Sequence, residues 1–138
     1  MLSLIRERHM FATTLSRIAT IATLAITLGT VHLAKSVVAD GKPLPAGTYQ
    51  IRVTDEGPAP AAGQSADSEK WVEFLQGGKV VGREVASIIP QSEIAEHVKG
   101  PMPKANGSRV DNLKGGDYVR VWIHKADKHY LINLGAGK

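Results

Sequence analysis

The sequence predicts an all-β fold, a small antiparallel β-sandwich or barrel of about six strands. Two runs, KWVEFLQGGKVV (residues 70–81) and RVDNLKGGDYVRVW (residues 109–122), each fold back on a Gly-Gly pair. Gly-Gly between two alternating segments is typical of a β-hairpin. In both runs apolar residues recur at every second position, which indicates strands with one buried face.

The first 39 residues are predicted to be a secretory signal peptide. Three arginines against one acid precede an uncharged apolar stretch that runs from Ile18 to Ala34, and Val37 and Ala39 fit a small-residue cleavage site. A histidine and a lysine keep the apolar run short of the ~20 residues that a spanning helix needs. We therefore expect cleavage after Ala39, no membrane insertion afterwards, and a periplasmic or secreted protein. An uncleaved membrane anchor is the alternative.

The composition of the remaining chain, residues 40–138, excludes several classes of function. The whole sequence has 17 Lys+Arg and 13 Asp+Glu, but residues 1–39 hold four of the basic and one of the acidic residues, which leaves 13 against 12. Because a nucleic-acid-binding domain needs a basic surface, we expect no nucleic-acid partner. The sequence has no cysteine, which excludes thiol catalysis and cysteine-ligated zinc. No cofactor is expected.

Residues 40–138 are expected to form a single β domain that opens with a strand and a long loop. In LPAGTYQIRVT, residues 44–54, apolar and polar residues alternate as in a half-buried strand. The following stretch is rich in Ala, Gly, Pro, Ser and acids and has no apolar period. We expect residues 55–70 to be a flexible loop.

The hairpin that turns at Gly77-Gly78 should place its apolar residues on a core-facing side. That side carries Val72, Phe74, Val81 and Val85. The same alternation also turns Arg83 inward, which would bury a charge. A β-bulge near Gly82 would re-aim Arg83 and remove the conflict.

The last third of the chain is predicted to be a three-stranded antiparallel meander over residues 108–134. It follows a short helical turn expected near residues 91–98. The meander turns at Gly115-Gly116 and around Ala126-Asp127. Its core-facing residues are expected to be Val110, Val119, Val121, Ile123, Tyr130, Ile132 and Leu134.

The segments PAGTYQIRV and FLQGGKVV resemble a widespread group of small secreted bacterial β-proteins, in which a PAGTY-type strand precedes a hairpin with a GG or GK turn. The resemblance covers residues 44–85. It implies an exported, all-β, single-domain protein. The group has no assigned activity, so no functional residue is transferred from it.

The opposite face of the meander is the predicted binding surface. Its candidate ligand- or partner-binding residues are Arg109, Asp111, Tyr118, Arg120, Trp122 and Asn133. Aromatic rings flanked by such polar groups suit a sugar or a peptide. Two alternatives remain: the residues form ordinary cross-strand pairs that stabilise a solvated face, or a neighbouring segment covers Trp122 and makes a second small core.

His124 and His129 form the candidate metal site. The turn between them places the two imidazoles directly opposite each other, with Cβ atoms roughly 5 Å apart. Two histidines can chelate one metal ion, but catalytic zinc normally has three protein ligands. Adventitious capture of Ni²⁺ or Cu²⁺ is the alternative.

Taken together, these features predict an exported, non-catalytic β-module that binds an envelope polysaccharide or a protein partner. One alternative is a structural or assembly subunit that pairs with copies of itself through its edge strands, because unprotected edges template further pairing. The other is a minor metal-binding role through His124 and His129.

Overall fold

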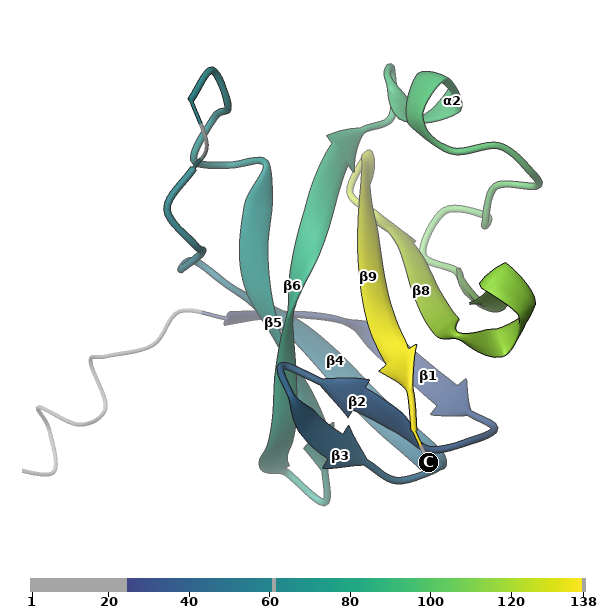
Figure 1. The fold of residues 1–138 in the computed structure, drawn as a ribbon. Coiled ribbons are helices and arrows are strands. Elements are labelled where there is room, and N and C mark those ends of the chain that lie inside the picture. Colours follow the sequence, from purple (N-terminus) through teal and green to yellow (C-terminus); the bar gives the residue numbers. More distant parts are fainter. Residues whose placement is uncertain (1–24, 61, 138) are drawn as a thin grey trace, which may run out of the picture.

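Strands make up most of the computed structural model, which describes residues 25–60 and 62–137 (Figure 1). A short helix, α2 (Ile94–His97), and a 3-10 turn, η1 (Lys114–Gly116), complete the described elements. The strands are β1 (Ala25–Leu33), β2 (Val37–Ala39), β3 (Lys42–Leu44), β4 (Gly47–Thr54), β5 (Glu69–Gln76), β6 (Lys79–Pro90), β7 (Ser108–Leu113), β8 (Tyr118–Lys125) and β9 (Lys128–Ala136). The all-β prediction is confirmed, and so is the short helical turn near residues 91–98.

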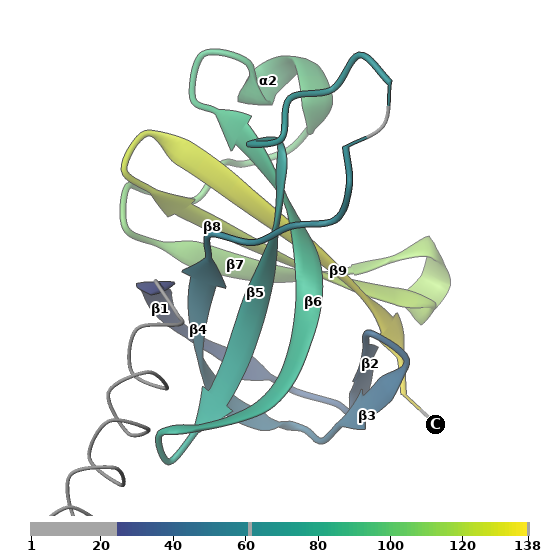
Figure 2. The same cartoon turned by 90° about the vertical axis from the view of Figure 1, so that its left-hand side faces the viewer.

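These strands form one open antiparallel sheet of nine strands instead of a six-stranded sandwich or barrel. Its main path runs β1-β4-β5-β6-β9-β8-β7, and the β2-β3 hairpin attaches to the end of β9. The sheet is curled, so that β7, β8 and β9 cross behind β4, β5 and β6 in Figure 2. In the described residues β1 and β7, at the two ends of the path, approach each other but do not pair.

The inner face of the curled sheet holds one apolar core. Nearly all residues that the alternation placed inward in the meander are buried there, together with Tyr49, Ile51 and Val53 of β4. Val110 is the exception, with 39% of its surface exposed. It lies on β7, at the open end of the sheet, where no further strand covers it.

Within the described residues, strands of the sheet are already present from Ala25, upstream of the predicted boundary at residue 40. β1 pairs with β4 along its whole length, and β2 pairs with β9. These two strands bury Leu28, Val31, Leu33, Val37 and Ala39 in the core. Cleavage after Ala39 would therefore remove two strands of the sheet. Residues 1–24 of the predicted signal peptide lie outside the described residues. Within the described residues, no helix is long and apolar enough to cross a membrane.

The β5-β6 hairpin contains the expected bulge. Leu75 lies opposite Val80 and Phe74 lies opposite Gly82, so Val81 is the extra residue and is 45% exposed. The expectation that Val81 faces the core is therefore wrong, as it is for Val85, which lies on the outer face. The same shift turns Arg83 outward, as proposed from the sequence.

Two long connections join strands of the sheet, and the second of them folds over its outer face. Loop 55–68 joins β4 to β5 and is tied to the sheet by hydrogen bonds from the Trp71 N–H to the Glu56 carbonyl and from the Ile88 N–H to the Ser68 carbonyl, both 2.8 Å. Residues 91–107, here termed the arm, join β6 to β7 and include α2. The loop is two residues shorter than expected, because β5 begins at Glu69.

Candidate functional site

The structure brings the predicted surface residues together on the outer face of β7, β8 and β9. Arg109 lies opposite Trp122, and Asp111 lies opposite Arg120. Arg120 in turn lies opposite Asn133. The predicted pairing of these strands is therefore confirmed, but the residues divide into a covered group and an open group. Tyr118 and Asn133 belong to the open group.

Trp122 belongs to the covered group, because the arm folds over it. The indole is 1% exposed and packs with Ile94 of α2 and Leu131 of β9 in a second small core. Ile89 and Val98 pack against the same cluster. The interpretation of Trp122 as an exposed contact residue is corrected: the arm supplies the apolar partners that an indole on a sheet surface otherwise lacks.

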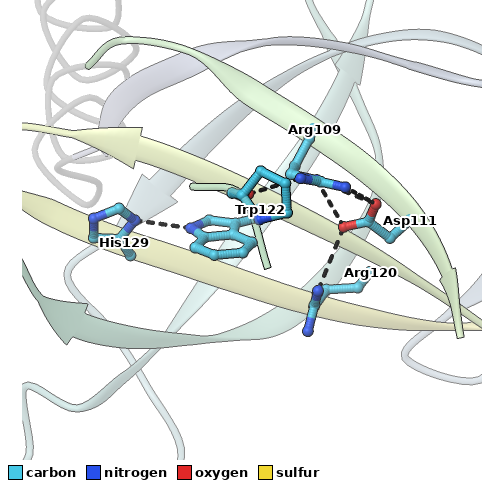
Figure 3. Close-up of polar contacts among 6 residues, drawn as sticks. Arg109, Asp111, Arg120, Trp122 and His129 are labelled. Carbon is cyan, nitrogen blue, oxygen red and sulfur yellow. Dashed lines mark hydrogen bonds and ion pairs between the residues drawn. The ribbon is translucent and has the colours of Figure 1, made fainter. Parts of the chain in front are cut away.

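The indole nitrogen of Trp122 begins a hydrogen-bonded chain inside this small core. Its N–H donates to Nδ1 of His129 at 2.8 Å (Figure 3). Since an indole N–H can only donate, Nδ1 of His129 is unprotonated and the ring proton lies on Nε2. Nε2 donates to Oε1 of Gln91, the first residue of the arm. Burial, and secondarily the neighbouring His124, lowers the pKa of His129 below the ordinary histidine value.

His124 lies flat against His129 and holds the other end of the arm. The two ring centroids are 4.1 Å apart and the ring planes differ by 24°. Nδ1 of His124 is 3.0 Å from the carbonyl oxygen of Pro103, and because a carbonyl only accepts, Nδ1 carries the proton. The His124 backbone also exchanges hydrogen bonds with Asn106 and Gly107.

This geometry argues against the predicted metal site at His124 and His129. Imidazole lone pairs lie in the ring plane, so two nearly parallel stacked rings do not point them at a common ion. Both nitrogens of His129 are already engaged, by Trp122 and by Gln91. Among residues 25–60 and 62–137 there is also no group of three or more ligating side chains. The two histidines are neighbours, as predicted, but three of their four ring nitrogens already have hydrogen-bond partners.

Arg109, Asp111 and Arg120 form an ion-pair cluster beside Trp122 (Figure 3). The Asp111 carboxylate accepts hydrogen bonds from Arg109, the shortest 2.7 Å, and from Arg120 at 3.4 Å. The hydrogen bond from Arg109 is the main reason why the pKa of Asp111 is lowered. Arg109 also donates to the carbonyl oxygen of Pro101 at 2.7 Å. The cluster therefore fastens the arm to β7, and its charges are largely used within the fold.

A cleft of about 530 Å³ opens between loop 55–68 and α2. Its floor is the end of β6, formed by Ile88, Ile89 and Pro90. Polar side chains line the remainder: Gln64, Ser65, Asp67, Ser68, Glu69, Ser87, Glu93, His97 and Lys128. The cleft was missed in the sequence, because its walls come from two connections that have no periodicity and lie far apart in the chain.

Trp71 is a second feature that the sequence interpretation left out. It lies on β5 two residues from Glu69 of the cleft, and it is only half-buried. The Arg83 guanidinium lies over its ring, 3.9 Å from the centroid, and is paired with Asp40 at 3.0 Å. The proposed bulge near Gly82 was the available signal, because it turns Arg83 onto the face that carries Trp71.

Ser65 and Ser68, two of the three serines that line the cleft, are engaged in local turn contacts. Oγ of Ser65 accepts the N–H of Asp67 at 3.1 Å, and the Ser68 hydroxyl donates to the Ser65 carbonyl at 2.8 Å. An activated nucleophile would instead be hydrogen-bonded to a general base. The cleft thus has the apolar floor and polar walls of a binding site, without the hydrogen bonding of an acyl-transfer site at Ser65 or Ser68.

Comparison of the chain with protein-family models, with curated proteins and with solved structures finds no match.

Proposed function

We propose that this protein is an exported, non-catalytic β-module that binds an envelope component, a polysaccharide or a protein, in the cleft between loop 55–68 and α2. The supporting observation is the cleft itself, an open depression with an apolar floor and polar walls. Its volume of about 530 Å³ lies in the ~300–1,000 Å³ range of ligand sites. Long connections that a rigid sheet positions are also where binding residues concentrate.

The chemistry of the cleft suits a ligand with both apolar and polar groups. Ile88, Ile89 and Pro90 offer an apolar surface, whereas Asp67 and Glu93 offer carboxylate acceptors on opposite sides. Trp71 and its stacked Arg83 extend the same outer face beyond Glu69, and they provide an aromatic surface of the kind first expected from Trp122. Export is proposed from the basic and apolar start of the sequence.

A substitution that fills the cleft from strand β6 tests this proposal. Ser87 lies on β6, lines the cleft and is partly exposed, so Ser87→Arg should obstruct binding and leave the sheet intact. Thr30→Arg on β1 is the matched control, because Thr30 is an exposed strand residue outside the cleft lining. Both variants and the unchanged protein would be immobilised and exposed separately to purified peptidoglycan, to other envelope polysaccharide and to envelope protein.

The expected result is that one fraction is retained by the unchanged protein and by Thr30→Arg, and is lost with Ser87→Arg. Equal retention by all three proteins would show that the cleft is not the site. Retention of no fraction would contradict the binding function itself.

Assembly through edge strands is a second candidate, supported by the open ends of the sheet. β3 is a poor pairing edge, because it has three residues that include Lys42 and Pro43. β7 is a better one, since it ends the main path and exposes Val110. Light scattering of the purified protein should then show oligomers that Val110→Lys disrupts, whereas a monomer at all concentrations would eliminate this candidate.

A further inference from the structure

We propose that His124 and His129 form an acid-sensitive latch, which holds the arm over Trp122 at neutral pH and releases it on acidification. This proposal concerns the arm alone and does not depend on the ligand of the cleft. It would make one side of the cleft responsive to pH, because Glu93 and His97 of the arm line that side.

The two histidines make side-chain contacts near both ends of the arm. Near its start, Oε1 of Gln91 accepts a hydrogen bond from His129. Near its end, the carbonyl oxygen of Pro103 accepts a hydrogen bond from His124. Between these points the arm is held by apolar packing of Ile94 and Val98 on Trp122 and by the hydrogen bond from Arg109 to Pro101.

Protonation of His129 is incompatible with the hydrogen bond to Trp122. An imidazolium carries protons on both nitrogens, so its Nδ1–H would face the indole N–H, which is also a donor and is 2.8 Å away. One of the two rings must then move. Because both side chains are buried, such movement opens the small core that the arm completes.

Stacking strengthens this response to acid. A second proton on His124 would place two cations in rings whose centroids are 4.1 Å apart. Their repulsion would be weakly screened, because both rings are shielded from solvent. Two protonated rings therefore disfavour the packed arrangement.

The charges around the pair offer little compensation. In the part of the chain that the structure describes, neither imidazole takes part in an ion pair. The charged groups on the surrounding elements are Lys125 and Arg120 of β8, Lys128 of β9, Arg109 and Asp111 of β7, Asp127 of the turn, Asp67 and Glu69 beside the cleft, and Glu93, Glu96, His97, Lys99 and Lys104 of the arm. Asp111 is already paired with Arg109 and Arg120.

The direction of the pH effect follows from the lowered pKa of His129, which burial causes first and His124 second. The released arm leaves this ring in water, where its pKa is near the ordinary value of about 6.5. The released state therefore binds the proton first. The latched state is fully favoured above about pH 6.5. Its advantage declines between that pH and the lower pKa of the packed state, where the loss is complete.

Tryptophan emission of the full chain provides the test. The chain has two tryptophans, so a Trp71→Phe background leaves Trp122 as the reporter. Between pH 7.5 and 5 we expect a red shift of the emission and faster hydrogen exchange in residues 91–107, while exchange in the β5-β6 hairpin stays slow. In that background, His129→Gln and His124→Phe should remove or reduce the pH response, because neither replacement titrates in this range.

His32→Gln and His97→Gln are the matched controls, since both histidines are exposed and should leave the response unchanged. Constant emission and exchange down to pH 5 would overturn the proposal. So would an undiminished response in both latch variants. If the latch variants do not fold, the exchange experiment on the unsubstituted chain decides: acid-induced exchange of the arm and the β5-β6 hairpin together would be global unfolding and would refute a latch.

Discussion

Replacement of Trp122 by alanine separates a structural role from a binding role. The indole is 1% exposed and packs against Ile94 and Leu131. Removal of a buried tryptophan side chain costs about 3–5 kcal/mol of unfolding free energy. For a domain of this size, about 4 °C of melting temperature is lost per kcal/mol, so Trp122→Ala should melt roughly 12–20 °C lower than the unchanged protein.

A second variant apportions that loss between packing and hydrogen bonding. Trp122→Phe keeps most of the apolar contact but leaves Nδ1 of His129 without its donor, a change worth about 1–3 kcal/mol. Trp71→Ala is the control, because Trp71 is half-buried on an open face, and it should cost below about 2 kcal/mol.

The assay is thermal and urea unfolding followed by circular dichroism, which reports the sheet in all variants. The reasoning would be refuted if Trp122→Ala melted within a few degrees of the unchanged protein. That outcome would mean that the arm contributes little to stability, and it would return Trp122 to the binding surface.

Three further predictions concern the first strands, Asp111 and metal binding. A chain of residues 40–138 should fail to fold cooperatively, whereas residues 25–138 should fold. The reason is that burial of Leu28, Val31, Leu33 and Val37 contributes about 1.5–3 kcal/mol each, a sum that rivals the ~5–15 kcal/mol stability of a whole domain. Equal melting curves of the two chains would show that β1 and β2 are dispensable. Because the pKa of Asp111 is lowered in the fold, its carboxylate stabilises the fold at pH values above the ordinary pKa of 3.8, and this effect is lost as the pH falls further. Asp111→Asn should therefore lower the unfolding free energy by about 1–3 kcal/mol at neutral pH and weaken its dependence on acid. Excess Zn²⁺ should not raise the melting temperature, because Trp122 and Gln91 engage both nitrogens of His129; a rise that depends on zinc and is lost with His129→Gln would contradict the stacked arrangement.

Local patterns in the sequence were sufficient to predict the strands from Gly47 onward. Alternation of apolar and polar residues has the period of a strand whatever the rest of the chain does, so the inward residues of β4, β8 and β9 were predicted correctly. The Gly-Gly pairs located two hairpin turns, because glycine adopts positive φ at little cost. Even the β5-β6 bulge was signalled locally, by the conflict that inward alternation created at Arg83.

The start of the domain could not be determined in this way. The stretch from Ile18 to Ala34 is uncharged and apolar, which suits the hydrophobic part of a signal peptide. The same composition, rich in threonine and isoleucine, also suits a buried strand. Only the pairing of β1 with β4 and the burial of Val31 and Leu33 place its second half in the sheet.

What lies over each face was likewise decided by the tertiary structure. The alternation of apolar and polar residues correctly assigned Trp122 and the two histidines to the outer face. It does not predict which distant segment covers that face. The arm has one short helical turn and two prolines, so its docking depends on a few contacts, from Gln91 to His129 and from Ile94 to Trp122. Such contacts require that the sheet holds both ends of the arm near β8 and β9. For this reason the strands and their faces were determined by local sequence, whereas the covered tryptophan, the stacked histidines and the cleft were determined by long-range packing.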